Sequence, residues 1–279
     1  MKIQTGMKIL IGLLVGINSA SILAAHTVNA DQLSAMLNET SASFDNYHST
    51  TQLTPVTTSR GVPSVSLSSP SAFGGAGTVL FATLGYVNHW DGTDVQDGDA
   101  GLGVSFGDPY QYVGGLISTN IDSLGFNSDA FAQNGGVGFR INRYLDDATA
   151  VAVGMGTTVG WGAFSHIAHS YYAAVTHAFA TPLPMSLNMG VGTGALYGGN
   201  DSVENKDNHY RPFAGVGFGL FKNFSLILDY TANEFTAGGN YSFVFWKLPF
   251  FVSASYANFA RLNGAEPHMQ LGAGVAYPI

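Results

Sequence analysis

The chain has 279 residues, carries a formal net charge of −8 and contains only 10% charged residues. Soluble domains contain about 25% charged residues, so most of the outer surface of this protein is not built to face water. The negative charge argues against a nucleic-acid partner, which requires clustered cations, and the absence of cysteine excludes disulfides, thiolate metal sites and a cysteine nucleophile.

The first 25 residues have the features of an export signal. Lys2 and Lys8 give a positively charged start, residues 9–17 form a short apolar core, and the small residues Ala24 and Ala25 offer a cleavage site. The apolar core is shorter than the roughly 20 residues that a membrane-spanning helix requires. Residues 1–25 are therefore predicted to be a signal peptide that is removed on export.

Residues 26–76 lack the pattern that fills the rest of the chain. Leu33, Met36 and Leu37 would share one face of a short helix, and residues 49–70 are rich in serine, threonine and proline without sustained periodicity. Such a segment is a tail, a linker, or a plug that enters a larger domain. As a plug it would place the short helix against apolar residues of that domain, whereas a plain tail would stay outside.

From residue 77 onward, segments of about ten residues alternate large apolar side chains with small or polar ones. Between Met185 and Val191, for example, the alternating positions are Ser186, Asn188 and Gly190. A period of two indicates β-strands with one apolar face. The predicted strands are 77–89, 99–106, 110–120, 135–144, 148–161, 169–180, 185–197, 209–221, 224–232, 239–246, 250–260 and 268–279.

Short turns alternate with longer polar connections along this region. The short turns are 107–109, 145–147, 181–184, 222–223 and 247–249, and the long connections are 90–98, 121–134, 162–168, 198–208, 233–238 and 261–267. An even number of strands with both chain ends on the short-turn side is typical of outer-membrane barrels. We therefore predict that residues 77–279 form an all-β fold, a closed antiparallel transmembrane β-barrel of twelve strands, with ten or fourteen strands as alternatives.

The two faces of the predicted strands differ in the size of their side chains. A soluble barrel places large residues inside, whereas a membrane barrel faces them outward and lines its interior with small or polar residues. Aromatic residues gather near the strand ends, as expected for two girdles at the membrane interfaces. They are Tyr86, Trp90, Tyr110, Tyr144, Trp161, Tyr171, Tyr197, Tyr210, Phe224, Phe250 and Tyr277.

The C-terminal strand resembles the signal that the outer-membrane insertion machinery reads in barrel proteins. Its alternating apolar residues are Leu271, Val275, Tyr277 and Ile279, with Ile279 in place of the usual terminal aromatic residue. The resemblance implies this machinery as a partner.

Two glycine-containing motifs carry a second resemblance. Residues 69–74 (SPSAFG) and 99–108 (DAGLGVSFGD) are similar to segments of a group of uncharacterised exported bacterial barrel proteins. This resemblance covers about residues 62–279. It implies a porin-like Gram-negative outer-membrane barrel and no chemistry.

Charged residues are sparse on the predicted inward face, which contains Arg140, Arg211 and Asp229. Arg211 and Asp229 fall on neighbouring strands. We expect them either to form a hydrogen-bonded pair in the lumen or to extend toward a membrane interface.

Five large apolar residues also fall in the inward phase, on four consecutive strands. A water-filled pore gains nothing from them, so they predict a wall that receives a plug or a path for an apolar solute. The remaining possibility is a β-bulge that reverses the two faces. These residues are Phe213, Ile227, Val244, Trp246 and Phe251.

The connection after the first predicted strand holds four carboxylates, those of Asp91, Asp94, Asp97 and Asp99. Calcium binds several oxygens at such a density. The spacing is not that of an EF-hand, however, and acidic turns are commonly solvated. These residues are a weak calcium candidate, and no other metal site is predicted.

Serine and histidine occur together near the third long connection, at Ser165, His166, His169 and Ser170. Some outer-membrane barrels are phospholipases or deacylases, which need a nucleophile, a base and an orienting group at one wall. No barrel-enzyme motif matches, and no acid follows on the same strand face. A hydrolase is the weakest interpretation, and we predict no enzyme activity and no cofactor.

The sequence therefore predicts an integral outer-membrane β-barrel that acts as a passive channel or small-solute transporter. Its expected partners are outer-membrane lipid and lipopolysaccharide, the insertion machinery, and a small solute that the sequence does not identify. The alternative from another class is a structural or surface-interaction barrel that acts through its external loops.

Overall fold

The computed structural model describes residues 41–43, 48–50, 62–74, 77–89, 96–121, 124, 131–162, 165, 169–180, 183–194, 210–231, 234–261 and 267–279. These residues all belong to one compact unit, Ser34–Ile279. Within the described part of the chain, no helix has the length and hydropathy needed to cross a membrane.

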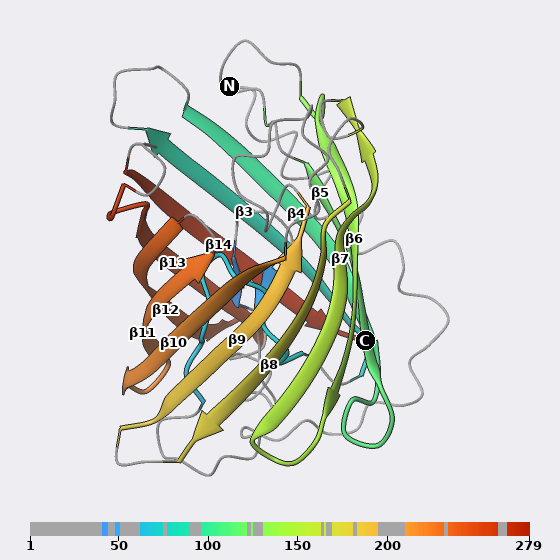
Figure 1. Ribbon diagram of the computed structural model, residues 1–279, viewed down its shortest axis with the longest axis vertical. Coiled ribbons are helices and arrows are strands. Elements are labelled where there is room, and N and C mark those ends of the chain that lie inside the picture. Colours follow the sequence, from blue (N-terminus) through green and yellow to red (C-terminus); the bar gives the residue numbers. More distant parts are fainter. Residues whose placement is uncertain are drawn as a thin grey trace. The chain divides into compact units, whose positions relative to one another are not determined.

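Twelve antiparallel strands form a closed barrel, and the first of them, β3, pairs with the last, β14. The strands are tilted and wind around a common lumen (Figure 1). This confirms the predicted all-β fold and the predicted number of barrel strands. The barrel strands are β3 (Val79–His89), β4 (Gln96–Gly107), β5 (Gly114–Ile121), β6 (Gly135–Tyr144), β7 (Thr149–Trp161), β8 (Tyr171–Phe179), β9 (Met185–Thr193), β10 (Arg211–Phe221), β11 (Phe224–Thr231), β12 (Glu234–Phe245), β13 (Leu248–Ala257) and β14 (His268–Pro278).

Two short strands precede the barrel. β1 (Ser41–Ser43) and β2 (His48–Thr50) pair with each other as an antiparallel two-stranded sheet. β1 lies next to β13 and β14 of the barrel.

Several strand boundaries differ from the predicted ones, and two of these differences have a clear physical cause. β12 begins at Glu234, so the connection after β11 is residues 232–233 and not a long loop. The predicted strand began only at Gly239 because glycine and alanine at 237–239 weaken the alternating signal. β5 begins at Gly114, because residues 108–113 form a turn in which the carboxylate of Asp108 accepts backbone N–H groups two and three residues on.

The two faces of the barrel wall have opposite chemistry, in the order predicted for a membrane barrel. Large apolar residues project outward from the strands: Leu84, Leu102, Ile117, Ile141, Val153, Val175, Met189, Val191, Leu226, Leu228, Val252 and Leu271. Polar residues are buried on the inward face: Thr83, Ser105, Asn120, Asn142, Thr176, Ser186, Asn188, Ser225, Thr236, Asn240, Ser242, Ser255 and Gln270. An apolar belt of this kind is stable only against an apolar surrounding.

The apolar belt leads to a test of what surrounds it. Leu84→Arg places a charge in the middle of β3 and should lower the free energy of unfolding in lipid bilayers by about 2–4 kcal/mol. Leu145→Arg is the matched control, because Leu145 has a similar exposed fraction (61% against 58%) but lies in the turn after β6. Equal effects of the two substitutions in urea titrations would contradict a lipid-facing belt.

Candidate functional site

A segment of the chain that precedes the first barrel strand lies inside the lumen. All residues of Val62–Gly74 are buried except Ser64, which is half-buried. The segment enters beside Ser186 and Ser225, which lie next to short turns, and its tip reaches Asp229 deeper in the barrel. It then returns toward the short-turn end. We call Val62–Gly74 the lumen segment.

The side chain of Asp229, on β11, holds the tip of the lumen segment. Its Oδ2 oxygen accepts hydrogen bonds from three consecutive backbone N–H groups: Leu67 (2.9 Å), Ser68 (2.7 Å) and Ser69 (2.8 Å). The hydroxyl groups of Ser66 and Ser68 lie 3.1 and 3.4 Å from the same oxygen. Consecutive N–H groups converging on one anion form a nest, and hydrogen bonds to a charged group contribute about 1.5–3 kcal/mol each.

Other side chains of the wall also bind the backbone of the lumen segment. Side chains on β6, β8, β9 and β11 donate to its carbonyl groups or accept its N–H groups. The donors are Ser186 to Pro63 (2.9 Å), Asn188 to Pro70 (2.9 Å) and Arg140 to Ser71 (3.2 Å), and the acceptors are Ser225 from Ser64 (2.9 Å) and Thr176 from Ala72 (2.8 Å).

Two glycines of β10 provide the room for this close approach. A Cβ atom at Gly217 would overlap the carbonyl oxygen of Ser64, and one at Gly215 would overlap that of Val65. Glycine is required at these positions because the backbone of the lumen segment takes the place of a side chain.

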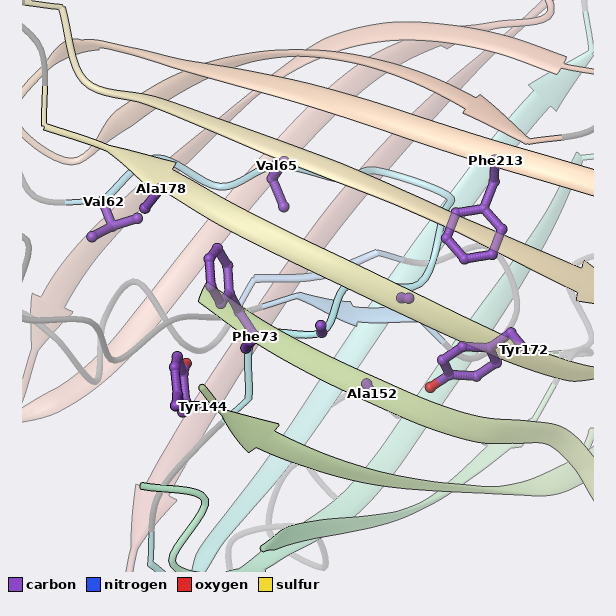
Figure 2. Packing of buried hydrophobic residues seen from close by; sticks show 11 residues of the cluster. Val62, Val65, Phe73, Tyr144, Ala152, Tyr172, Ala178 and Phe213 are labelled. Atoms are coloured by element: carbon purple, nitrogen blue, oxygen red, sulfur yellow. The ribbon is translucent and has the colours of Figure 1, made fainter. Parts of the chain in front are cut away.

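An aromatic stack anchors the end of the lumen segment that returns to the short turns. The ring of Phe73 is fully buried and stacks on Tyr144, with centroids 5.9 Å apart. Tyr144 in turn stacks on Tyr110 at 4.3 Å. Figure 2 shows Phe73 and Tyr144 side by side, with Val62 and Val65 of the lumen segment in the same apolar cluster. The prediction that Tyr110 and Tyr144 belong to an interfacial girdle is wrong, because both rings pack into this cluster.

The structure separates the three predicted lumen charges. Arg140 and Asp229 are buried in the lumen. Asp229 accepts N–H groups at the tip of the lumen segment, including that of Ser69, and Arg140 donates to the carbonyl of Ser71. Arg211 is half-buried at the other end of the barrel, opposite Gly192. Asp229 lies opposite Gly215, four residues or about 13 Å along β10 from Arg211, so the expected pair between them is not supported by the register.

The predicted apolar wall is present only in part. Phe213, Ile227 and Phe251 are buried on the inward face, which also excludes a reversal of the faces in these strands. Trp246 is 84% exposed, because it lies in the two-residue turn between β12 and β13 and has a positive φ of 49°. Val244 is also exposed, near the same turn. Trp246 was therefore wrongly assigned to the wall, whereas Val244 keeps the inward phase of Asn240 and Ser242 in β12.

The buried phenylalanines do not form a surface that receives a helix. Phe213 is paired with Gly190 and Phe251 with Gly274, and each ring occupies the space beside the glycine of the neighbouring strand. The rings therefore fill notches in the wall. The helix predicted around Leu33, Met36 and Leu37 lies outside the described residues.

The acidic connection and the serine–histidine group add no assembled site to the described residues. Asp99 is a buried residue of β4, while Asp91, Asp94 and the side chain of Asp97 lie outside the described part. Within that part, no three histidines or carboxylates are grouped to hold a metal ion. The hydroxyl of Ser165 donates to the carbonyl of Gly162 at 2.7 Å, and His166 lies outside the described residues.

No family model matches the chain, and no curated protein matches it. Among solved structures, the NanC porin has 14% sequence identity and a TM-score of 0.44, with 72% of this chain and 100% of that chain covered. OprB of Pseudomonas putida at low pH has 10% identity, a TM-score of 0.27 and coverages of 72% and 92%. Neisserial surface protein A has 12% identity, a TM-score of 0.19 and coverages of 72% and 96%. None of these values supports the transfer of a solute or partner to this chain.

The close contact at Gly217 can be tested directly. Gly217→Ala should force the lumen segment away from β10 at a cost of about 1–3 kcal/mol, and so expose the segment roughly 5- to 150-fold more often. Because the chain has no cysteine, Ala72→Cys, at a buried position of the lumen segment, reports this exposure through its labelling rate with a hydrophilic maleimide.

The matched control is Gly219→Ala on the same strand and face. A Cβ atom there meets Pro184 at an ordinary 3.4 Å, so the labelling rate should not change. Labelling that rises equally in both variants would show that the effect comes from the strand and not from the contact with Ser64.

Proposed function

We propose that the protein is an integral outer-membrane β-barrel that conducts small polar solutes when the lumen segment leaves the barrel. The membrane assignment is supported by the outward apolar belt and the buried polar inward face. The control of conduction is supported by the lumen segment, which occupies the inner wall from β6 to β11.

The size of the barrel is compatible with conduction. Twelve strands spaced about 4.8 Å apart and tilted about 40° give a backbone diameter of about 24 Å. Serine, threonine and asparagine line the interior, so the space that the lumen segment vacates would fill with water. The polar side chains of the wall that bind the segment would then form hydrogen bonds with this water instead of remaining unpaired.

The second candidate is a structural or surface-interaction barrel whose lumen stays closed. The near-complete burial of the lumen segment is the observation in its favour. The two candidates differ in one measurable property, because only the channel gains conductance when the contacts of the segment are weakened.

Single-channel recording in planar bilayers separates these candidates. Asp229→Asn removes the charge that three N–H groups bind and should raise the open probability of the channel by at least tenfold, the effect of about 1.4 kcal/mol on the closed state. Asp146→Asn is the control, since Asp146 also accepts backbone N–H groups, those of Ala148 and Thr149 at 2.7 Å, but in an exposed turn, and the open probability should not change. A silent Asp229→Asn barrel that is correctly folded would favour the closed, structural alternative.

The proposed orientation places the turns that follow β4, β6, β8, β10 and β12 in the periplasm, and the connections at the opposite end of the barrel outside the cell. An epitope tag inserted between residues 201 and 205, in the polar connection between β9 and β10, should be labelled by antibody on intact cells. A tag between Lys222 and Asn223, the two residues between β10 and β11, serves as the comparison and should require permeabilised cells. The reverse pattern would invert the orientation.

A further inference from the structure

The wall of the lumen recognises peptide backbone more than side chains. Six wall residues bind main-chain N–H or C=O groups of the lumen segment: Arg140, Thr176, Ser186, Asn188, Ser225 and Asp229. These contacts run from Pro63 to Ala72. They do not depend on which side chains the bound peptide carries.

The donors and acceptors of the wall are matched to the polarity of a peptide. Asp229 can only accept, and it faces three successive N–H groups at the tip of the lumen segment. Asn188 and Arg140 donate to the carbonyl groups of Pro70 and Ser71, at 2.9 and 3.2 Å. Thr176 then accepts the next N–H group at 2.8 Å, that of Ala72. A ligand needs a regular series of amide groups to satisfy all of these positions.

One side-chain subsite completes the recognition surface. The fully buried ring of Phe73 lies on Tyr144, which is backed by Tyr110. Stacked aromatic pairs add about 0.5–1.5 kcal/mol to the burial of the ring. A ligand with an aromatic residue near its C-terminal end would use this subsite.

We propose that the same wall binds peptides supplied from outside the chain, so that short peptides with an aromatic residue are the solutes of the barrel. The lumen segment then acts as a competitor covalently attached to the site. This inference rests on the proposed function, because a peptide reaches the wall only after the lumen segment has left.

The test uses the full chain with residues 62–74 replaced by a glycine–serine spacer of equal length. The probe is the fluorescently labelled synthetic peptide VPSVSLSSPSAFG, the sequence of the lumen segment. Fluorescence anisotropy in detergent micelles should show saturable binding. Planar-bilayer recording of the same variant should show current that this peptide blocks at concentrations near its Kd.

Two altered peptides identify what the wall recognises. N-methylation of the amides that correspond to Leu67, Ser68 and Ser69 keeps the side chains but removes the donors to Asp229, and should weaken binding by at least tenfold. Replacing the phenylalanine that corresponds to Phe73 by alanine should weaken binding by at least tenfold, because it removes the burial of the ring as well as its stacking on Tyr144. In the protein, Asp229→Asn should reduce the difference between the methylated and unmethylated peptides.

The outcomes separate this inference from the proposed function. A spacer variant that conducts but does not bind the peptide, or that binds the methylated peptide equally well, overturns peptide recognition and leaves the channel intact. A folded spacer variant that binds the peptide but does not conduct overturns the channel. If the spacer variant fails to fold, the double substitution Leu67→Pro and Ser69→Pro removes two donors from the lumen segment, leaves every wall residue in place, and is measured in the same way.

Discussion

A carboxylate that is removed from bulk water needs hydrogen-bond donors, and Asp229 is such a carboxylate inside the barrel. Its Oδ2 oxygen takes three consecutive N–H groups from a segment that lies far away in the sequence. The position of the lumen segment follows from this contact, and so does the need for glycine on β10 where the segment crosses it. Binding through the backbone also explains why a serine-rich stretch without periodicity can have a defined place.

The wall is adapted to this task by the way its large residues are accommodated. Phe213 and Phe251 lie beside glycines of the neighbouring strands. In this position each ring lies over the glycine of the neighbouring strand and does not project far into the lumen. Polar side chains such as Asn188 on β9 and Thr176 on β8 are then free to reach the lumen segment.

Alternation along the chain was sufficient to predict the barrel, because a strand in a membrane wall must repeat every two residues whatever its neighbours do. It failed where glycine and alanine reduce the contrast between the faces, as at 237–239 before the predicted start of β12. It also failed at Trp246. The alternation in the sequence continues through the turn between β12 and β13, but the positive φ of Trp246 ends the extended backbone there, so its side chain does not follow the strand. The inward assignment of Arg140 and Asp229 needed only the phase.

The alternation along the strands could not predict what Arg140 and Asp229 bind inside the lumen. The lumen segment is held by its main chain, and the main chain is the same for every residue, so its sequence carries little trace of the contact. One indication was available. The stretch 69–74, one of the two motifs that carry the resemblance to known barrel proteins, includes Ser71 and Phe73, and these provide a carbonyl group to Arg140 and a ring to Tyr144.

The pairing of β3 with β14 has a consequence for the order of folding. These two strands are almost the whole barrel apart in sequence, so their pairing closes the longest loop in the wall and carries the largest entropic penalty. The lumen segment immediately precedes β3, and its binding partners lie on β6 to β11 in the middle of the chain. Once it is bound there, it holds the start of β3 near the sheet and shortens the search for β14. The segment that occupies the finished lumen is therefore also placed to act as a tether during assembly.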